Sequence, residues 1–272
     1  MKILEIVATI GLVAAAPSGA MAQAAALTQA DQAAIRQASD RGALLYAYDQ
    51  AAWHGTDDML AKLGDPKDRV GGWIVDGPAA SPELVFFDKD EAHPHAVYVA
   101  DFKDNRLVSS RVLGAGDDTS LSANRLRLIH ARAIGIAALE ASKEPRCSEN
   151  SYNTVVLPPA APGDPVLVYI LTPQTSNDTI PFGGHYLIPV SVDGKPGPIR
   201  HFAKSCAVFP MPQKGKGAPV ATYITHLLDP TPTEIHVFSS LTLHLPVYVG
   251  TSDNRVWSVE GARIGLVDPK AK

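Results

Sequence analysis

The sequence predicts an α+β protein in which a helix, a four-strand antiparallel meander and a second helix are followed by a β-rich half, a sandwich or a small barrel. Two observations favour this class. Apolar residues recur at helical spacing in two segments of the first half, and short apolar runs separated by turn residues fill most of the remaining chain. With 272 residues, of which 46% are hydrophobic and 19% charged, the chain is long enough for one large domain or two small ones.

The first predicted helix begins at Thr28 and ends near Trp53. Thr28 and Asp31 have the spacing of a capping box, and apolar side chains follow at close to the helical period. The strands of the meander are predicted at residues 72–75, 84–87, 96–102 and 107–113. A second helix is predicted from Ser122 to about Ala141. Because a lone sheet must bury its apolar side, we expect helices to cover one face of it.

The order of these segments resembles that of some small modules. A long helix is followed by GWIV and then by VYVADFKDNRLVSSRV, which resembles exported helix-plus-sheet modules such as PepSY and cystatin-like domains. The resemblance covers less than half of the chain. It implies an architecture and carries no residue-level function.

The second half, from Glu144 onward, is predicted to be nearly all β-structure. Its candidate strands are residues 154–157, 166–171, 185–192, 199–203, 220–228, 234–241, 247–250 and 255–259. Eight short strands separated by turn residues are typical of a sandwich or a small barrel. The stretch THLLDPTPTEIHVF, residues 225–238, is predicted to be a β-hairpin with its turn at residues 229–233, because Pro230 and Pro232 fix two φ angles of a short reversal.

The N-terminus has the pattern of a secretory signal peptide. Lys2 precedes an apolar run at residues 6–16, and AMA at residues 20–22 supplies small residues before a cut ahead of Gln23. The run is shorter than the roughly 20 residues that span a bilayer. We therefore expect cleavage near Ala22–Gln23, a secreted or periplasmic mature protein, and no integral membrane span in the mature chain.

Three parts of the chain are predicted from these patterns. They are a signal peptide at residues 1–22, an α+β domain at residues 23–143 and a β-rich domain at residues 144–272. The second and third parts can also form one continuous fold, and the sequence leaves both arrangements open.

The two cysteines are expected to form a disulfide. In an oxidising compartment, Cys147 and Cys206 have one possible intramolecular pairing. Two separate buried thiols are the alternative. Neither cysteine lies in a C-x-x-C spacing or beside a recognisable activating group, which argues against a catalytic thiol.

Charge and motifs exclude several common functions. A formal net charge of −4 leaves no broad basic surface, so nucleic acid is not an expected partner. The sequence contains no G-x-S-x-G, Walker A, H-E-x-x-H or EF-hand pattern, and no G-x-G-x-x-G after a strand. No cofactor is predicted. The three tryptophans are expected to be packing residues; they are Trp53, Trp73 and Trp257.

The candidate metal ligands are His226, Glu234 and His236, which lie in the predicted hairpin. Residues two apart on a strand share a face, and a hairpin would bring the two imidazoles together. A structural metal site needs four ligands and a catalytic site about three with water, so a further ligand would be needed from elsewhere. The candidates for it are His185, His201 and His244. We therefore predict no metal and interpret the two hairpin histidines as cross-strand neighbours.

These features predict an exported soluble protein of the cell envelope that binds an envelope protein or a small ligand and is not a catalyst. The alternative is a His/Glu-dependent hydrolase or metalloprotein with its site in the β-rich half. Convergence of three or more of its histidine and glutamate side chains within ligand reach would favour the alternative.

Overall fold

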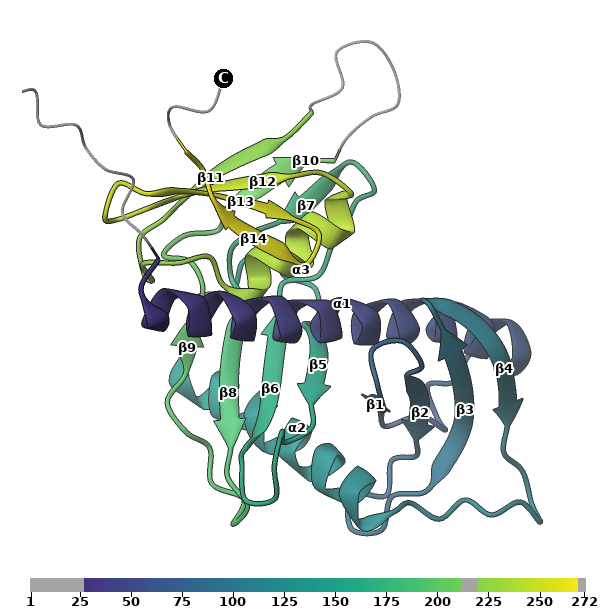
Figure 1. The fold of residues 1–272 in the computed structure, drawn as a ribbon. Helices are drawn as coiled ribbons and strands as arrows, with labels where there is room; N and C mark the ends of the chain where they lie inside the picture. The colour runs from purple at the N-terminus through teal and green to yellow at the C-terminus, as the bar shows by residue number, and fades with distance from the viewer. Residues whose placement is uncertain (1–26, 212–219, 269–272) are drawn as a thin grey trace, which may run out of the picture.

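The computed structural model describes residues 27–211 and 220–268, so the predicted signal peptide lies outside the described part of the chain. The fold is mixed α+β, as predicted (Figure 1). The elements of the first half are α1 (Gln29–Leu63), β1 (Gly72–Asp76), β2 (Glu83–Phe87), β3 (Ala96–Lys103), β4 (Arg106–Val112) and α2 (Ala123–Ser142). The elements of the second half are β5 (Asn153–Leu157), β6 (Val166–Leu171), β7 (Thr179–Pro181), β8 (Tyr186–Val190), β9 (Arg200–His201), β10 (Val208–Pro210), β11 (Thr222–His226), α3 (Glu234–Leu243), β12 (Val247–Thr251), β13 (Val256–Glu260) and β14 (Arg263–Leu266).

Helix α1 runs across the molecule and touches both halves (Figure 1). Its N-terminus is the predicted capping box. The Thr28 hydroxyl accepts a hydrogen bond from the Asp31 amide at 3.0 Å, and the Asp31 carboxylate accepts one from the Thr28 amide at 3.1 Å. The helix continues past Trp53, its predicted end, and stops at Gly64, whose φ of 70° lies in the region that favours glycine.

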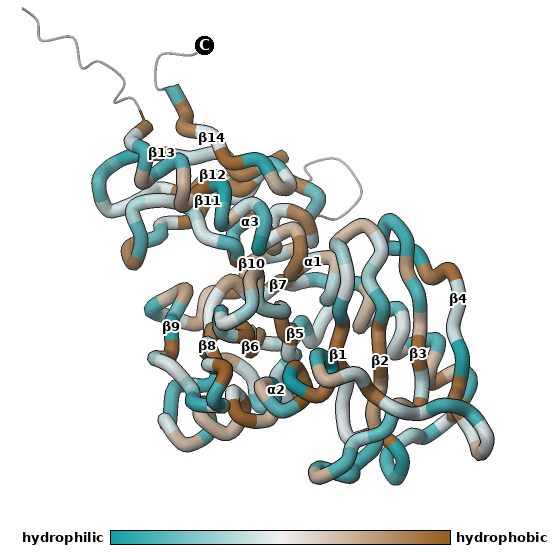
Figure 2. Tube along the Cα trace, turned by 60° about the horizontal axis from the view of Figure 1, so that its bottom comes forward, coloured by the Kyte–Doolittle hydropathy of each residue, from teal (hydrophilic) through white to brown (hydrophobic). Residues whose placement is uncertain are grey.

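Two four-strand sheets lie side by side beneath α1, and each follows a helix in the chain. Helix α1 is followed by the sheet β1-β2-β3-β4, and α2 is followed by the sheet β5-β6-β8-β9. Both sheets are antiparallel meanders. Their edge strands β1 and β5 contact each other (Figure 1). In Figure 2, hydrophobic residues lie along the middle of the β1–β3 strands and hydrophilic residues gather at their turns.

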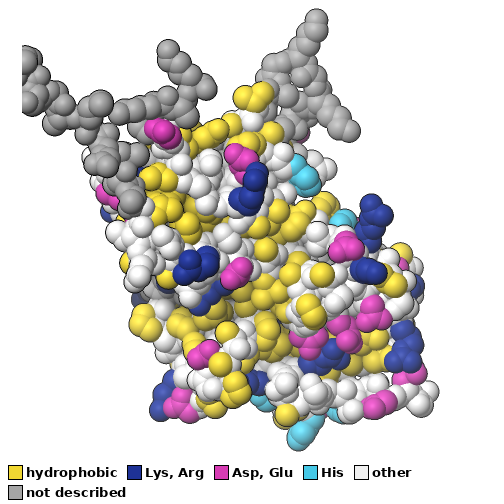
Figure 3. All heavy atoms as spheres, in the orientation of Figure 1, with side chains coloured by type: hydrophobic (Ala, Val, Ile, Leu, Met, Phe, Trp, Pro, Cys, Tyr) yellow, Lys and Arg dark blue, Asp and Glu magenta, His cyan; other side chains and the backbone are white. Residues whose placement is uncertain are grey.

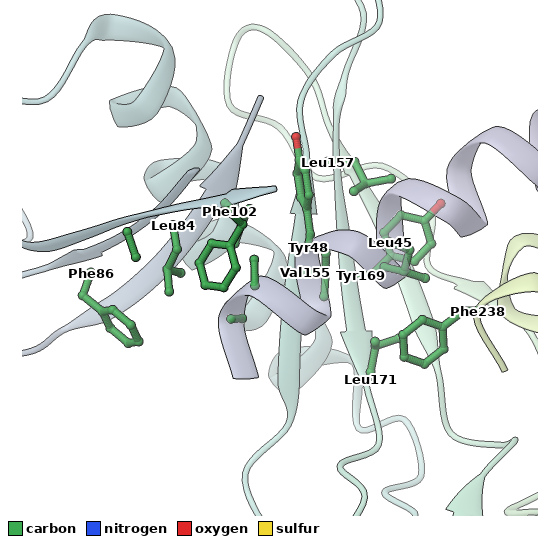
Figure 4. Close-up of a cluster of buried hydrophobic side chains, with 14 of the residues drawn as sticks. Leu45, Tyr48, Leu84, Phe86, Phe102, Val155, Leu157, Tyr169, Leu171 and Phe238 are labelled. Carbon is green, nitrogen blue, oxygen red and sulfur yellow. The ribbon is translucent and has the colours of Figure 1, made fainter. Parts of the chain in front are cut away.

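Alternate strand residues face two hydrophobic cores on opposite sides of these sheets. On the α1 side, Leu45 packs in one cluster with Phe86 of β2 and Tyr169 of β6 (Figure 4). The neighbouring residues Val85 and Ile170 belong to the second cluster, on the α2 side. Each core therefore draws residues from both sides of the predicted boundary at residue 144.

A third unit, made of β11, α3 and β12 to β14, lies on the other side of α1 (Figure 1). Strand β11 pairs in parallel with β12, so the chain must cross over between them, and α3 is this crossover. Helix α3 packs against α1 at Gly42, where a Cβ atom would collide with the side chain of Val237 and the carbonyl oxygen of Glu234. The close approach of the two helices therefore depends on a glycine.

The prediction of a β-hairpin at residues 225–238 is wrong. Strand β11 ends at His226, and residues 234–241 belong to α3. The helix begins after Thr233, whose amide donates a hydrogen bond to Nδ1 of His236 at 3.0 Å. Residues 231–240 are all buried, polar and apolar alike, so the segment lacks the division into an apolar and a polar face that normally identifies a helix in a sequence.

The β-rich second half is confirmed, and its described strands form three open sheets instead of one closed barrel. Besides the two four-strand sheets, β7 and β10 pair as a two-strand ribbon. Strands β7, β10 and β14 were not expected from the sequence. None of the described helices is both long and apolar enough to cross a membrane.

Candidate functional site

The candidate site is a pocket of about 510 Å³ at the seam between the two side-by-side sheets. Helix α1 forms one wall, the starts of β1 and β5 form the base, and α3 and the segment between β6 and β7 close the other side. The lining includes the side chains of Asp49, Trp53, Trp73, Asn153, His185 and Phe238. They come from distant parts of the sequence and meet only in the folded chain.

Asp49 is the carboxylate of this pocket. Nδ2 of Asn153, the first residue of β5, donates a hydrogen bond to its Oδ1 at 2.5 Å. Part of Asp49 remains accessible, but protein atoms surround it densely, and this burial raises the pKa of the carboxyl group to about 6. Hydrogen bonds from the side chains of Asn153 and Gln50 oppose the increase only in part. Asp49 is therefore a carboxylate whose charge the protein stabilises poorly.

Two tryptophans flank the pocket. Trp53 follows Asp49 by one helical turn, and its side chain is 57% exposed. One side of Trp53 stacks on the imidazole of His54, with ring centres 5.0 Å apart. Trp73 is half-buried, and the guanidinium carbon of Arg132 lies 5.1 Å from its ring centre. The pocket therefore offers indole surface beside a carboxylate.

His185 is a structural part of the wall. Its Nδ1 accepts a hydrogen bond from the Thr172 amide at 3.2 Å, which places the proton on Nε2, and Nε2 lies 3.1 Å from the Pro181 carbonyl oxygen. Burial lowers the pKa of His185 to about 4. The ring is therefore neutral at physiological pH, with both nitrogens engaged.

The predicted disulfide is present and stands beside this wall. Cys147 and Cys206 are joined, with their Cα atoms 5.4 Å apart. A Cβ at Gly184 would collide with Cys147 and with the hydroxyl of Thr172, a pocket residue, so the disulfide packs directly behind the pocket. Gly184 has a φ of 73°, which lies in the region that favours glycine.

The predicted candidates His226 and His236 lie together, but Glu234 does not join them. The two imidazole rings have an edge-to-face contact with centres 4.8 Å apart, and Nε2 of His226 lies 2.9 Å from Oδ2 of Asp229. Burial lowers the pKa of His236 to about 3, with the neighbouring His226 as a smaller cause.

Glu234 points toward the other side of α3. Its Oε1 accepts a hydrogen bond from the Tyr169 hydroxyl at 2.8 Å and lies 4.0 Å from Nη1 of Arg41. The buried glutamate thus connects α3 to β6 and α1. It serves as an internal anchor between the third unit and the rest of the molecule.

The other histidines considered as ligands are dispersed. His185 is in the pocket wall, and His201 lies 3.3 Å from the carboxylate of Glu144. His244 is exposed at the C-terminus of α3, with a φ of 55°. Within residues 27–211 and 220–268, no group of three or more His, Cys, Asp or Glu side chains is placed to hold a metal ion.

The sequence interpretation missed the pocket, although one signal was available. Asp49 and Trp53 are four residues apart in a helix, so they share a face. That face also carries the buried Leu45 and Ala52, which makes Asp49 an acid on the core side of α1. Comparison of the chain with protein-family models, curated proteins and solved structures found no match.

Proposed function

We propose that this protein is an exported, non-catalytic protein that binds a small organic ligand in the pocket between α1, β5 and α3. The observation that carries the proposal is the pairing of Asp49 with the indoles of Trp53 and Trp73 in one cavity. Small-molecule sites are commonly concave, about 300–1,000 Å³ in volume, and lined by apolar and aromatic groups with a few convergent polar atoms.

The chemistry of the lining favours binding over catalysis. The described lining has three titratable side chains. Asp49 bonds to an amide, His185 bonds to the backbone through both nitrogens, and the ring of Tyr152 faces the guanidinium of Arg146. A nucleophilic mechanism needs a nucleophile within hydrogen-bond reach of a base. Among the described residues of the lining, no nucleophile is hydrogen-bonded to a base. We therefore assign the pocket a binding role.

Export is supported by the Cys147–Cys206 disulfide, because such bonds persist in oxidising compartments. The signal-peptide pattern in residues 1–22 points to the same compartment. On the face shown in Figure 3, charged side chains of both signs are interspersed and hydrophobic side chains reach the surface in the middle. Such a surface fits a small-molecule binding protein with no nucleic-acid partner.

Ligand-observed NMR with a library of small organic fragments tests the pocket. Thr56 lines it, and Thr56→Trp should fill it with an indole. Asp57→Trp adds the same side chain one residue later, at an exposed position outside the lining, and serves as the matched control. We expect fragments to bind the wild type and D57W but not T56W. Equal binding to all three proteins, or no binding to the wild type, would contradict the proposal.

No second function is proposed for the β-rich half. A hydrolase or metalloprotein centred on His226, Glu234 and His236 would need space for a substrate or a third ligand. None of these side chains lines any of the three main pockets of the described chain.

A further inference from the structure

Within the described chain, the pocket lining carries negative charge without positive charge. Asp49 is the acidic residue of its lining, and neither lysine nor arginine is present among the described residues that form it. The other polar side chains are neutral amides, hydroxyl groups and the neutral imidazole of His185. Arg132 lies against Trp73, but it does not line the pocket, and its Nε donates to the Thr154 hydroxyl at 2.9 Å.

The carboxylate of Asp49 lacks a protein counter-ion. The carboxylate accepts hydrogen bonds from the side-chain amides of Asn153 and Gln50, and no ion pair with it occurs in the described part of the chain. A desolvated carboxylate without a cation is unfavourable, and a cationic group that enters the pocket would relieve this cost.

The aromatic groups beside Asp49 suit the same kind of guest. The face of an indole attracts ammonium groups through its quadrupole, most strongly where water is excluded. Trp53 is the exposed indole of the pair, and Phe238 and Leu171 add apolar surface deeper in the lining. A ligand with a charged nitrogen and an apolar body would match both features.

We propose that the pocket takes an organic cation, an ammonium group on an apolar body, with Asp49 as its counter-ion and Trp53 as its aromatic platform. This inference rests on the proposed binding function and specifies the ligand class. An anionic ligand would face an uncompensated carboxylate. A neutral polyhydroxyl ligand could still use the Asp49–Asn153 pair and an indole, and it is therefore the competing outcome of the test.

Isothermal titration at pH 8 with matched probes separates these classes. The cationic probes are choline, tetramethylammonium and benzylamine. The uncharged probes are the carbon isostere of choline, benzyl alcohol and methyl glucoside. We expect the cations to bind the wild type at least about tenfold more tightly than their uncharged counterparts.

Two variants test whether Asp49 causes the preference for cations. Asp49→Asn keeps the shape and an acceptor for the Asn153 amide, and it should reduce cation affinity to that of the uncharged isosteres. Asp57→Asn removes an exposed acid of the same helix outside the pocket lining and should leave the preference unchanged. Circular dichroism spectra that match the wild type show that both variants are folded.

Each outcome has a defined meaning. Equal affinity for charged and uncharged probes, tighter binding of methyl glucoside, or unchanged cation affinity in D49N would overturn the inference while the binding function stands. If the wild type binds neither these probes nor any member of the fragment library, the binding function itself fails.

Discussion

Asp49 gives the pocket its charge at a cost to the stability of the fold. The pKa of this carboxyl group is raised to about 6 because burial disfavours the ionised form. An unfolded chain ionises the same group near pH 4, so between about pH 4 and pH 6 the folded state binds more protons than the unfolded state. Stability from this residue is therefore lost as pH rises through that interval.

Replacing Asp49 with Asn should remove this loss. We expect D49N to exceed the wild type in free energy of unfolding by roughly 1–2 kcal/mol at pH 8, with the difference shrinking to near zero below pH 4. Urea denaturation of both proteins from pH 3.5 to pH 8 measures it. A D49N variant that is less stable than the wild type at pH 8 would show that the ionised carboxylate contributes to folding instead of opposing it.

His236 has the opposite pH dependence. Burial lowers the pKa of this imidazole from 6.5 to about 3, so below pH 6.5 the unfolded chain takes up a proton that the folded chain refuses. Its Nδ1 also accepts the Thr233 amide at the start of α3. Glutamine at this helix position can accept the same hydrogen bond without titrating.

We therefore expect His236→Gln to reduce the loss in free energy of unfolding that the protein shows as pH falls below 6.5. Between pH 6.5 and pH 4 the wild type should lose roughly 2–3 kcal/mol more than H236Q does. The comparison uses the same urea series, in which the remaining groups titrate alike in both proteins. Parallel profiles for the two proteins would mean that His236 is protonated in the folded state.

Most helices and strands could be predicted because each carried its own local signal. Thr28 and Asp31 identified the start of α1, and alternating apolar residues identified the β1–β4 meander, where the observed and predicted bounds nearly coincide. Helix α3 carried a misleading signal. It is buried over most of its length, its first turn carries Ile235 and Val237 at the alternating spacing of a strand, and two prolines precede it, so its local pattern favoured a strand.

The pocket could not be read from the sequence for a different reason. Its lining joins α1, β1, β5 and α3, and the contacts between them arise from the packing of two sheets against one long helix. Local patterns do not encode such contacts. The predicted site at the histidines was wrong for another reason. Glu234 and His236 are close in sequence, which suggested a joint site, but the helix turns their side chains to different sides.

A substitution at the contact between α1 and α3 tests the packing of the two helices, because helix propensity and packing predict opposite effects on stability there. Alanine in place of Gly42 would favour the isolated helix by roughly 1 kcal/mol. In the protein its Cβ would overlap Val237 and the Glu234 carbonyl, and separating the helices should cost more than that gain.

We expect Gly42→Ala to lower the free energy of unfolding by roughly 1–3 kcal/mol. Guanidinium denaturation measures this change. A G42A variant more stable than the wild type would show that the two helices can move apart at little cost.

Across the whole molecule, α1 and two shared cores connect the segments on either side of residue 144. The disulfide adds a covalent link within the second segment, between residues 59 positions apart, and it stands behind the pocket wall. A crosslink of this span stabilises a fold by roughly 4 kcal/mol in the chain-entropy account.

The double variant Cys147→Ser, Cys206→Ser should therefore unfold at a clearly lower temperature than the oxidised wild type. Its affinity for pocket ligands should also fall, because the wall at Thr172 and His185 loses its support. Differential scanning calorimetry and titration calorimetry follow the two effects, and reduced wild-type protein is the control that keeps the side chains otherwise native. Unchanged thermal stability in the double variant would rule out a stabilising role for the bond.

The three tryptophans allow the most direct test of the binding site. Trp53 and Trp73 line the pocket, whereas Trp257 is fully buried in the third unit, where its indole donates to the Thr251 hydroxyl at 3.3 Å. The indole N–H signals of isotope-labelled protein are to be followed by two-dimensional NMR while choline is added. Binding in the pocket predicts that the Trp53 and Trp73 signals shift together and saturate while the Trp257 signal stays in place. Three unmoved signals at saturating choline, or a shift confined to Trp257, would contradict the assignment of this pocket as the ligand site.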